Sequence, residues 1–519
     1  MKPEKIAITG ADLKISDIVG LIRDENAKIE ISQSAKNRIV KSYDFLNQEI
    51  ANKIVYGANT GFGPMASHSL AKGQLLELQF NLIRSHAVGM GNPLPIPYIL
   101  AAMVVRLNTL AKGYSGVSSE LLDLLAAFIN MRIIPVVPEH GAVGTSGDLV
   151  QLAHIALALI GEGRVVFQGI EMSTAEALQK TNLKAHKLQP KEGLALINGT
   201  SFMSGIGAVI CDQASRLLNL AQRTGALALE LVQAFDDGIS EKLHSLRPHG
   251  GQVAIATNLR KLLESSKALR RRSVLKDHLN STDDVREMPA AIQEIYSLRC
   301  IPQILGPVLD TLRKTQADIQ TEINSVTDNP IVDWETEEFY HGGNFHGDQI
   351  ASTLDFLKIA VTKMTMLSER RINFFLNRNV NKIFPPFLNL KKPGLTLGLQ
   401  GLQFVATSTT AQSQSLAFPH HIHSIPTNGD NQDVVSMGTD AALLTAKVIE
   451  NAFIVLSIES ITLAQAVDFK NDGQKLCAES KKFYDAVREL FPKIVDDREI
   501  ISELRKITQM LKDASEFDL

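Results

Sequence analysis

The stretch around which this chain is organised is a glycine-rich turn, Gly141-Ala142-Val143-Gly144-Thr145-Ser146-Gly147-Asp148-Leu149. Apolar residues then recur at helical spacing from Val150 to Ile160. Glycine is needed where the backbone takes a positive φ or where another group approaches closely. The pattern therefore predicts a tight turn that leads into a buried helix, with Ser146 on an unusually bare piece of backbone.

Several interpretations of Ser146 can be compared. Ser146 or Asp148 would be suitable N-caps for the following helix. A nucleophile elbow requires glycine two residues after the serine, where Asp148 stands, and a phosphate-binding loop requires Lys-Ser/Thr after its last glycine. What remains is chemical: with no side chain on Gly147, its amide nitrogen can approach the Thr145 carbonyl carbon and close a five-membered ring. Dehydration of Ser146 would then leave an electrophilic methylidene.

This tripeptide resembles that of the aromatic amino acid and histidine ammonia-lyases, whose methylidene-imidazolone cofactor (MIO) usually forms from Ala-Ser-Gly followed by Asp-Leu. The resemblance implies that Thr145, Ser146 and Gly147 form MIO without a metal or nucleotide cofactor. Thr145 departs from the usual alanine. Because its side chain would lie outside the ring, the departure bears on tuning of the cofactor more than on ring formation.

A second glycine-rich loop reads Tyr56-Gly57-Ala58-Asn59-Thr60-Gly61-Phe62-Gly63-Pro64. Its partial fit to a dinucleotide fingerprint is opposed by Pro64 and by the lack of a βαβ pattern around it. Taken alone, Tyr56 fits a structural loop tyrosine equally well. The ammonia-lyases carry Tyr-Gly-x-Asn-Thr-Gly-Phe-Gly here, matched at every specified position, and the resemblance implies that Tyr56 is the catalytic base.

Two further motifs lie in the first half. Ser85 and His86 end a helical pattern, where a histidine is commonly a structural or helix-dipole partner; the resemblance instead places both in the pocket for the substrate side chain. Asn198-Gly199 is a typical turn. The resemblance makes Asn198 a catalytic residue that contacts substrate or cofactor.

The second half contributes three polar stretches. Residues 293–300 place a guanidinium beside a phenol, and Arg299 suits either an ion pair or a bidentate carboxylate clamp. Loops 341–347 and 428–433 carry ordinary turn chemistry. The resemblance implies catalytic roles for Tyr296 and Arg299, and it places further residues in the substrate site: Gln293, Phe345, Asn428, Asn431 and Gln432. No metal is predicted at His420, His421 and His423, because no recognised ligand spacing completes that group.

Composition narrows the class of protein. The 519-residue chain is 45% hydrophobic and 21% charged, typical of a soluble globular protein with a large core. Its net charge of −3 gives no footprint for nucleic acid or membrane. The three cysteines are isolated, and neither a signal core nor a membrane span is evident. A reducing, cytoplasmic setting is expected, and the substrate has to be argued from the site residues.

The predicted fold is mostly α, a long-helix bundle of the ammonia-lyase type with a smaller mixed N-terminal part. Helical spacing covers 75–88, 97–110 and 118–130, a β-like piece lies at 5–8, and three long segments lack Gly and Pro: 308–329, 348–377 and 439–472. We expect an N-terminal domain, 1–205, carrying the MIO tripeptide and the base loop, and a bundle domain, 206–519, used for assembly. The resemblance, which spans roughly residues 40–470, implies a homotetramer with active sites shared between subunits.

The expected reaction removes ammonia from an aromatic L-amino acid, with the MIO methylidene as electrophile and Tyr56 taking the β-proton. Ser85-His86 looks like the selector of histidine lyases, whereas Gln432-Asp433 matches the aromatic lyases, which replace the Gln-Glu of the histidine enzymes. Because His86 can bond a phenol, L-tyrosine to trans-4-coumarate is predicted first. The alternatives are L-histidine to urocanate, then a phenylalanine ammonia-lyase or a 2,3-aminomutase. A non-catalytic helical scaffold is opposed by the presence of Ser146, Tyr56 and Arg299.

Overall fold

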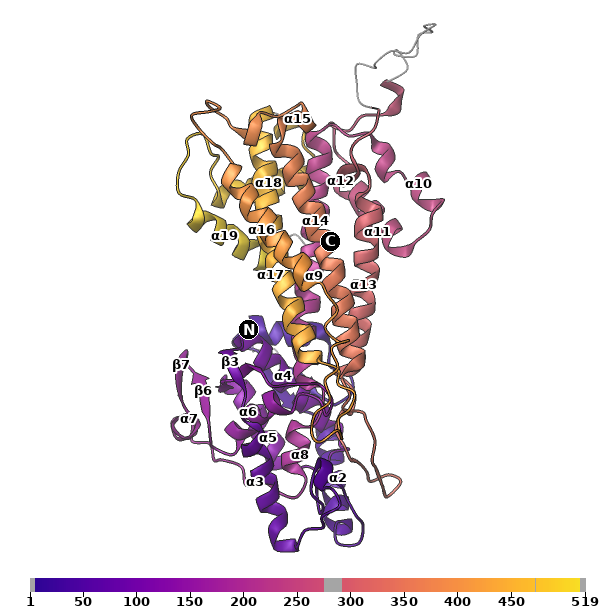
Figure 1. Ribbon diagram of the computed structural model, residues 1–519, viewed down its shortest axis with the longest axis vertical. Coiled ribbons are helices and arrows are strands. Elements are labelled where there is room, and N and C mark those ends of the chain that lie inside the picture. Colours follow the sequence, from indigo (N-terminus) through magenta and orange to yellow (C-terminus); the bar gives the residue numbers. More distant parts are fainter. Residues whose placement is uncertain (1–4, 275–291, 472, 514–519) are drawn as a thin grey trace. The chain divides into compact units, whose positions relative to one another are not determined.

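The computed structural model describes residues 5–274, 292–471 and 473–513. They form two compact units, each assembled from separate stretches of chain (Figure 1). The first unit is drawn from Met1–Asp212, Lys314–Asp355 and Pro419–Thr445, and the second from Gln213–Arg313, Phe356–Phe418 and Ala446–Leu519. The predicted domains, 1–205 and 206–519, divide the chain only once, and the role of the second in assembly stays a prediction.

The strands of the first unit are short and form four small sheets. β1 (Lys5–Ile8) pairs in parallel with β2 (Lys28–Ile31), and three antiparallel sheets are built from β3 (Met90–Pro93) with β5 (Pro138–His140), from β4 (Ile134–Pro135), β6 (Arg164–Phe167) and β7 (Ile170–Ser173), and from β8 (Ile331–Asp333) with β9 (Glu338–Tyr340). The predicted β-like piece at 5–8 is confirmed as β1. The fold of this unit is mainly helical.

Helices supply the core of the first unit. They are α1 (Ile15–Arg23), α2 (Gln33–Glu49), α3 (Leu75–His86), α4 (Ile96–Ala111), α5 (Ser119–Met131), α6 (Leu149–Leu159), α7 (Thr174–Thr181) and α8 (Glu192–Ile197). The predicted helices at 75–88, 97–110 and 118–130 are confirmed as α3, α4 and α5. Every residue of α4 from Tyr98 to Ala111 is buried, so this helix runs through the core.

Four long helices have residues in both units: α9 (Ser201–Leu231), α13 (Ile301–Glu322), α14 (Asp348–Leu376) and α17 (Gly438–Lys470). The second unit also contains α10 (Glu241–Ser245), α11 (Gly250–Leu262), α12 (Tyr296–Arg299), α15 (Arg378–Asn381), α16 (Gln400–Leu416), α18 (Ala478–Leu490) and α19 (Ile501–Asp513). Short 3₁₀ helices are η1 (Gly63–Met65), η2 (Lys72–Gln74), η3 (Asp236–Ile239), η5 (Pro386–Leu388) and η6 (Gly473–Lys475). The mostly α, long-helix architecture is therefore confirmed.

The predicted helix at 308–329 was wrong at both ends. α13 begins at Ile301 and contains Pro307, and it ends at Glu322. Beyond its end, the Asn324 side chain exchanges hydrogen bonds of 2.8 and 2.9 Å with the main chain of Leu13. A tertiary contact thus replaces the helical pattern that the sequence suggested.

A buried ion pair joins three of the long helices in the second unit. Arg371 on α14 pairs with Glu459 on α17, and neither side chain is exposed. Arg371 also donates to the Thr224 hydroxyl on α9 at 3.2 Å, and Ser368 donates to Glu459 at 2.6 Å. These bonds satisfy polar groups that would otherwise be unpaired in the core.

Among the described residues, α17 is the one helix long and apolar enough to cross a membrane by length and composition. However, 72% of its most apolar 18-residue window is buried within the protein. A core helix passes the same test.

Candidate active site

A cavity of about 740 Å³ lies in the first unit. It gathers most of the site residues that the sequence indicated: Tyr56, Ser85, His86, Ser146, Gly147, Asn198, Phe345, Asn428, Asn431 and Gln432. They come from the Tyr56 loop, the end of α3, the turn before α6, the end of α8 and the two later loops. Segments far apart in sequence therefore converge on one pocket.

The Ser146 turn has a backbone that only glycine can provide. Gly144 and Gly147 both have φ of +73°. A Cβ on Gly147 would lie 2.0 Å from the Gly199 carbonyl oxygen, because the two chain segments form a parallel bridge there. The Asp148 N–H donates to that same oxygen at 2.9 Å. The glycine after Ser146 is thus required by close approach as well as by its dihedral angle.

Two donors converge on the main-chain carbonyl oxygen of Ser146. Asn198 Nδ2 lies 2.8 Å from it and the Gly199 nitrogen 3.2 Å. The Ser146 hydroxyl in turn accepts from Gln432 Nε2 at 2.8 Å. Paired donors of this kind stabilise negative charge on an oxygen atom, as an oxyanion hole does.

The turn is also held from the side of the later loops. The Gly144 carbonyl accepts from Ser436 Oγ at 2.8 Å and from the Gly347 N–H at 3.0 Å. Met437 N donates to the Val143 carbonyl at 3.0 Å. The turn is therefore fixed by the residues that immediately precede α14 and α17.

Asp148 does not cap the helix that it precedes. Although Asp148 occupies the N-cap position of α6, it makes no side-chain cap bond there. Its buried carboxylate accepts from the N–H groups of Phe202 and Met203 at 3.0 and 2.9 Å, at the start of α9, and from the Thr439 hydroxyl at 2.6 Å. Burial raises the pKa of Asp148 to about 6, although these bonds act in the opposite direction. The simple capping interpretation is wrong, because the carboxylate joins the turn to a different helix.

Tyr56 presents its phenol at the cavity. The Gly63 N–H donates to Tyr56 Oη at 2.9 Å, and the Tyr56 N–H donates to His341 Nε2 at 3.2 Å. The glycine has φ of +52° and packs against the Asn428 side chain. The loop thus folds back on itself so that one of its own N–H groups meets the phenol oxygen.

The polar end of the cavity is formed where α3 ends. His86 Nδ1 lies 2.9 Å from the Leu82 carbonyl oxygen, which can only accept, so in the neutral ring Nδ1 carries the proton. Nε2 is then the acceptor nitrogen that His86 has for a ligand. Ser85 Oγ donates to the same carbonyl at 3.1 Å. This end of the cavity suits a substrate side chain that carries an N–H or O–H group.

Some cavity residues were not predicted, among them Met65, Leu78, Asn81, Leu82, Val143, Leu194 and Asn329. Helical spacing could have found part of this set, because Leu78, Leu82 and Ser85 recur on one face of α3. Asn329 lies in a loop without such a pattern.

Three predicted residues belong to the second unit. Gln293 precedes α12, and Tyr296 and Arg299 lie on it. The Arg299 guanidinium stands 4.8 Å from the Tyr296 ring centre. Tyr296 is 69% exposed. Among the described residues, those that line the cavity of the first unit do not include these three. The buried Thr145 is not among them either.

Two of the three histidines near residue 420 lie beside carboxylates, and His423 packs against His420. His420 Nε2 is 3.5 Å from Asp440, and His421 Nδ1 is 2.7 Å from Asp355. Within the described part of the chain, no group of three or more His, Cys, Asp or Glu is arranged to hold a metal ion.

Comparison with known proteins finds relatives along almost the whole chain. A family model described as aromatic amino acid lyase matches residues 13–489. A histidine ammonia-lyase from Caldanaerobacter subterraneus subsp. tengcongensis is 37% identical over 510 residues, covering 98% of this chain and 97% of that protein. A probable histidine ammonia-lyase from Thermoplasma volcanium is 39% identical over 507 residues, covering 98% of each. The crystal structure of a tyrosine aminomutase from Streptomyces globisporus superposes with a TM-score of 0.94 at 36% identity, covering 99% of this chain and 97% of that one.

Proposed function

Because the chain belongs to the aromatic amino acid lyase family, it is a carbon–nitrogen lyase that releases ammonia from an amino acid, and we propose that this amino acid is L-histidine. The observation that carries the proposal is full-length similarity, at 37% and 39% identity, to proteins named as histidine ammonia-lyases. The acceptor nitrogen of His86 agrees with it, because the imidazole of histidine carries an N–H donor. The product would be urocanate.

The Thr145-Ser146-Gly147 segment fits the precursor of MIO. The Gly147 N–H, which would attack the Thr145 carbonyl carbon, makes no hydrogen bond to another described residue. The Ser146 carbonyl, which would stay on the ring, already has two donors. When formed, the group supplies an electrophile that activates the substrate for loss of ammonia.

The residues of the chain then have separable roles. Tyr56 removes the β-proton, and His86 orients the substrate side chain by accepting its hydrogen bond. The side-chain oxygen of Asn198 is buried and accepts no hydrogen bond from any described residue, so it is available to a donor on the substrate. Phe345, Asn428, Asn431 and Gln432 enclose the ligand.

A carboxylate clamp is assigned to Arg299. Its Nε is buried without a partner among the described residues, and its guanidinium is held over Tyr296. We propose a homotetramer in which Gln293, Tyr296 and Arg299 reach the cavity of a neighbouring subunit. Arginine forms bidentate bonds with carboxylates, which suits this role.

L-Tyrosine, the substrate predicted first from the sequence, becomes the second candidate. It is supported by Gln432-Asp433 and by the similarity to a tyrosine aminomutase. A phenol O–H would meet His86 as well as an imidazole N–H would. Phenylalanine lacks such a donor, and a site built around an acceptor rejects it.

Parallel incubation with L-histidine, L-tyrosine and L-phenylalanine tests the proposal. Urocanate should dominate, and trans-4-coumarate or a β-amino acid as the main product would overturn the choice of histidine. Intact mass tests the cofactor separately: the purified protein should be lighter than its sequence by two waters. A Ser146→Ala variant should keep its full mass apart from the substitution and lose activity.

A further inference from the structure

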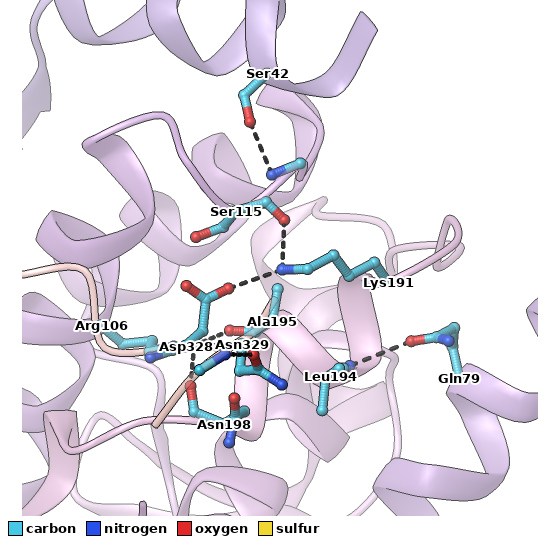
Figure 2. Close-up of polar contacts among 12 residues, drawn as sticks. Ser42, Gln79, Arg106, Ser115, Lys191, Leu194, Ala195, Asn198, Asp328 and Asn329 are labelled. Carbon is cyan, nitrogen blue, oxygen red and sulfur yellow. Dashed lines mark hydrogen bonds and ion pairs between the residues drawn. The ribbon is translucent and has the colours of Figure 1, made fainter. Parts of the chain in front are cut away.

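The Asn198–Gly199 turn, which supplies both donors to the Ser146 carbonyl, rests against one buried arginine. Arg106 lies on α4 and is 1% exposed. Its Nη2 donates to the carbonyl oxygen of Asn198 at 2.7 Å and also to that of Ala195 (Figure 2). One guanidinium nitrogen thus holds the end of α8 and the residue that follows it.

The contact leaves no free space behind the turn. A Cβ on Gly199 would lie 2.5 Å from Arg106 Nη1 and 2.7 Å from Thr327 Oγ1. Arg106 Nη1 also donates weakly to the Ser201 hydroxyl at 3.4 Å. The backbone that carries the Gly199 N–H therefore packs directly on the guanidinium.

The same short helix is fixed at its other end and along its length. Lys191, which precedes α8, donates to Asp328 at 2.8 Å and to the Ser115 carbonyl at 2.9 Å (Figure 2). Gln79 accepts from the Leu194 N–H at 3.2 Å and donates to the Gly57 carbonyl, next to Tyr56, at 2.9 Å. α8 is thus a rigid support that connects the base loop with the Ser146 turn.

Burying the charged side chain of Arg106 costs free energy, so a compensating benefit is expected. Burial lowers the pKa of Arg106 to about 10, despite the nearby carboxylates of Asp328 and Asp148. Its Nε is buried and has no hydrogen-bond partner among the described residues. Uncharged donors could bond the two carbonyl groups at a smaller desolvation cost. The need to hold the turn in a precise position therefore explains the arginine better than a gain in stability does.

We propose that Arg106 is a positioning residue: by holding the Asn198 and Ala195 carbonyls, it keeps Asn198 Nδ2 and the Gly199 N–H aimed at the Ser146 carbonyl. The proposal rests on the proposed function, because it assigns that carbonyl to the active MIO site. Arg106 touches neither the cavity nor the substrate, and acts only through the turn.

The test uses Arg106→Lys, which keeps the charge but loses the planar, fixed geometry of the donors. We expect kcat to fall at least roughly tenfold with KM changed by less than roughly threefold, since a misplaced donor loses part of the 10²–10³-fold effect of an oxyanion-hole donor. Arg132→Lys is the matched control. Arg132 Nη2 also donates to two main-chain carbonyls at the end of a helix, those of Leu21 and Asp24, outside the cavity lining.

A double-variant cycle separates positioning from general destabilisation. In an Asn198→Ala background, which already lacks one of the two donors, Arg106→Lys should lower kcat by a smaller factor than in the wild-type background, because only the Gly199 N–H is then left to be misplaced. Full additivity, or an equal loss in Arg132→Lys, overturns the proposal. If the lysine variant does not fold, Arg106→Gln, which retains an uncharged donor, enters the same cycle.

Intact mass keeps the two proposals apart. Wild-type protein that has not lost two waters contradicts the proposed function. Wild-type protein that has lost them, together with an Arg106→Lys variant of unchanged kcat, contradicts only the positioning role. Partial loss of water in freshly purified Arg106→Lys, with full loss in Arg132→Lys, supports it.

Discussion

The ammonium of Lys191 lies 2.8 Å from the carboxylate of Asp328, and neither side chain is exposed to solvent. Burial lowers the pKa of Lys191, and its partner opposes that change. Removing one member of such a pair leaves an unpaired buried charge. The pair therefore fixes the start of α8, and breaking it should lower the free energy of unfolding considerably.

Lys191→Met should lower the free energy of unfolding by about 3–5 kcal/mol, since Asp328 would remain buried without its counterion. Lys191→Met with Asp328→Leu should recover most of the loss, because neither member of the pair is then buried without the other. Urea unfolding followed by circular dichroism measures both. A double variant as unstable as the single one would show that packing, and not charge, is responsible.

Gly147→Ala should abolish ring formation. The added Cβ would lie 2.0 Å from the Gly199 carbonyl oxygen, and the φ of +73° disfavours any side chain there. The intact mass should then show no loss of water, and activity should disappear. Gly73→Ala is the control, because nothing lies within 4 Å of its added Cβ. An alanine variant at 147 that still loses two waters would contradict the geometry described for the turn.

His86→Leu should change which substrates are accepted. Removing the acceptor should lower kcat/KM for L-histidine by roughly 10- to 100-fold, the effect of leaving one buried donor unpaired. Turnover of L-phenylalanine, which has no such donor, should rise, because no acceptor is then left unpaired beside its ring. Steady-state kinetics with both substrates measure the ratio, and His68→Leu at an exposed loop position serves as control. An equal loss for both substrates would mean that His86 does not select the side chain.

Acid should destabilise the fold through His154. This residue on α6 accepts from the Gly89 N–H at 3.1 Å through Nε2, and burial lowers its pKa below the ordinary value of 6.5. Between the lowered pKa and 6.5, the unfolded chain binds a proton that the folded chain does not. The free energy of unfolding therefore falls as the pH drops through this window.

His154→Gln should reduce the slope of unfolding free energy against pH below 6.5, since one titrating group is removed. His244 and His341, whose pKa values burial also lowers, leave a residual slope of the same sign. Urea titrations at several pH values measure it. His68→Gln at an exposed position is the control, and an unaltered slope in His154→Gln would contradict the assignment.

The sequence predicted well the features that short motifs encode. The Ser146 turn and the Tyr56 loop depend on glycines at fixed local spacing, and both line the cavity. The roles assigned to their side chains stay predictions. Ser85 and His86 were found in the same way, at the end of a helix with clear apolar spacing.

Long-range partners could not be read from local pattern. Arg106 stands among apolar residues of α4, and only the fold reveals that it meets the end of α8. Asp148 has the spacing of an ordinary N-cap, yet its carboxylate accepts hydrogen bonds from N–H groups at the start of α9. The end of α13 was misjudged because the contact between Asn324 and Leu13 spans most of the first unit's sequence.

The contacts of Gly144 with Gly347 and Ser436 bear on the order of chain synthesis, folding and cofactor maturation. Residues on which the turn depends are among the later ones to leave the ribosome, so these bonds cannot hold the turn in place while the chain is still growing. Maturation of the proposed cofactor must then follow folding. The mass deficit of a purified sample consequently reports the fraction of molecules that once reached the native state.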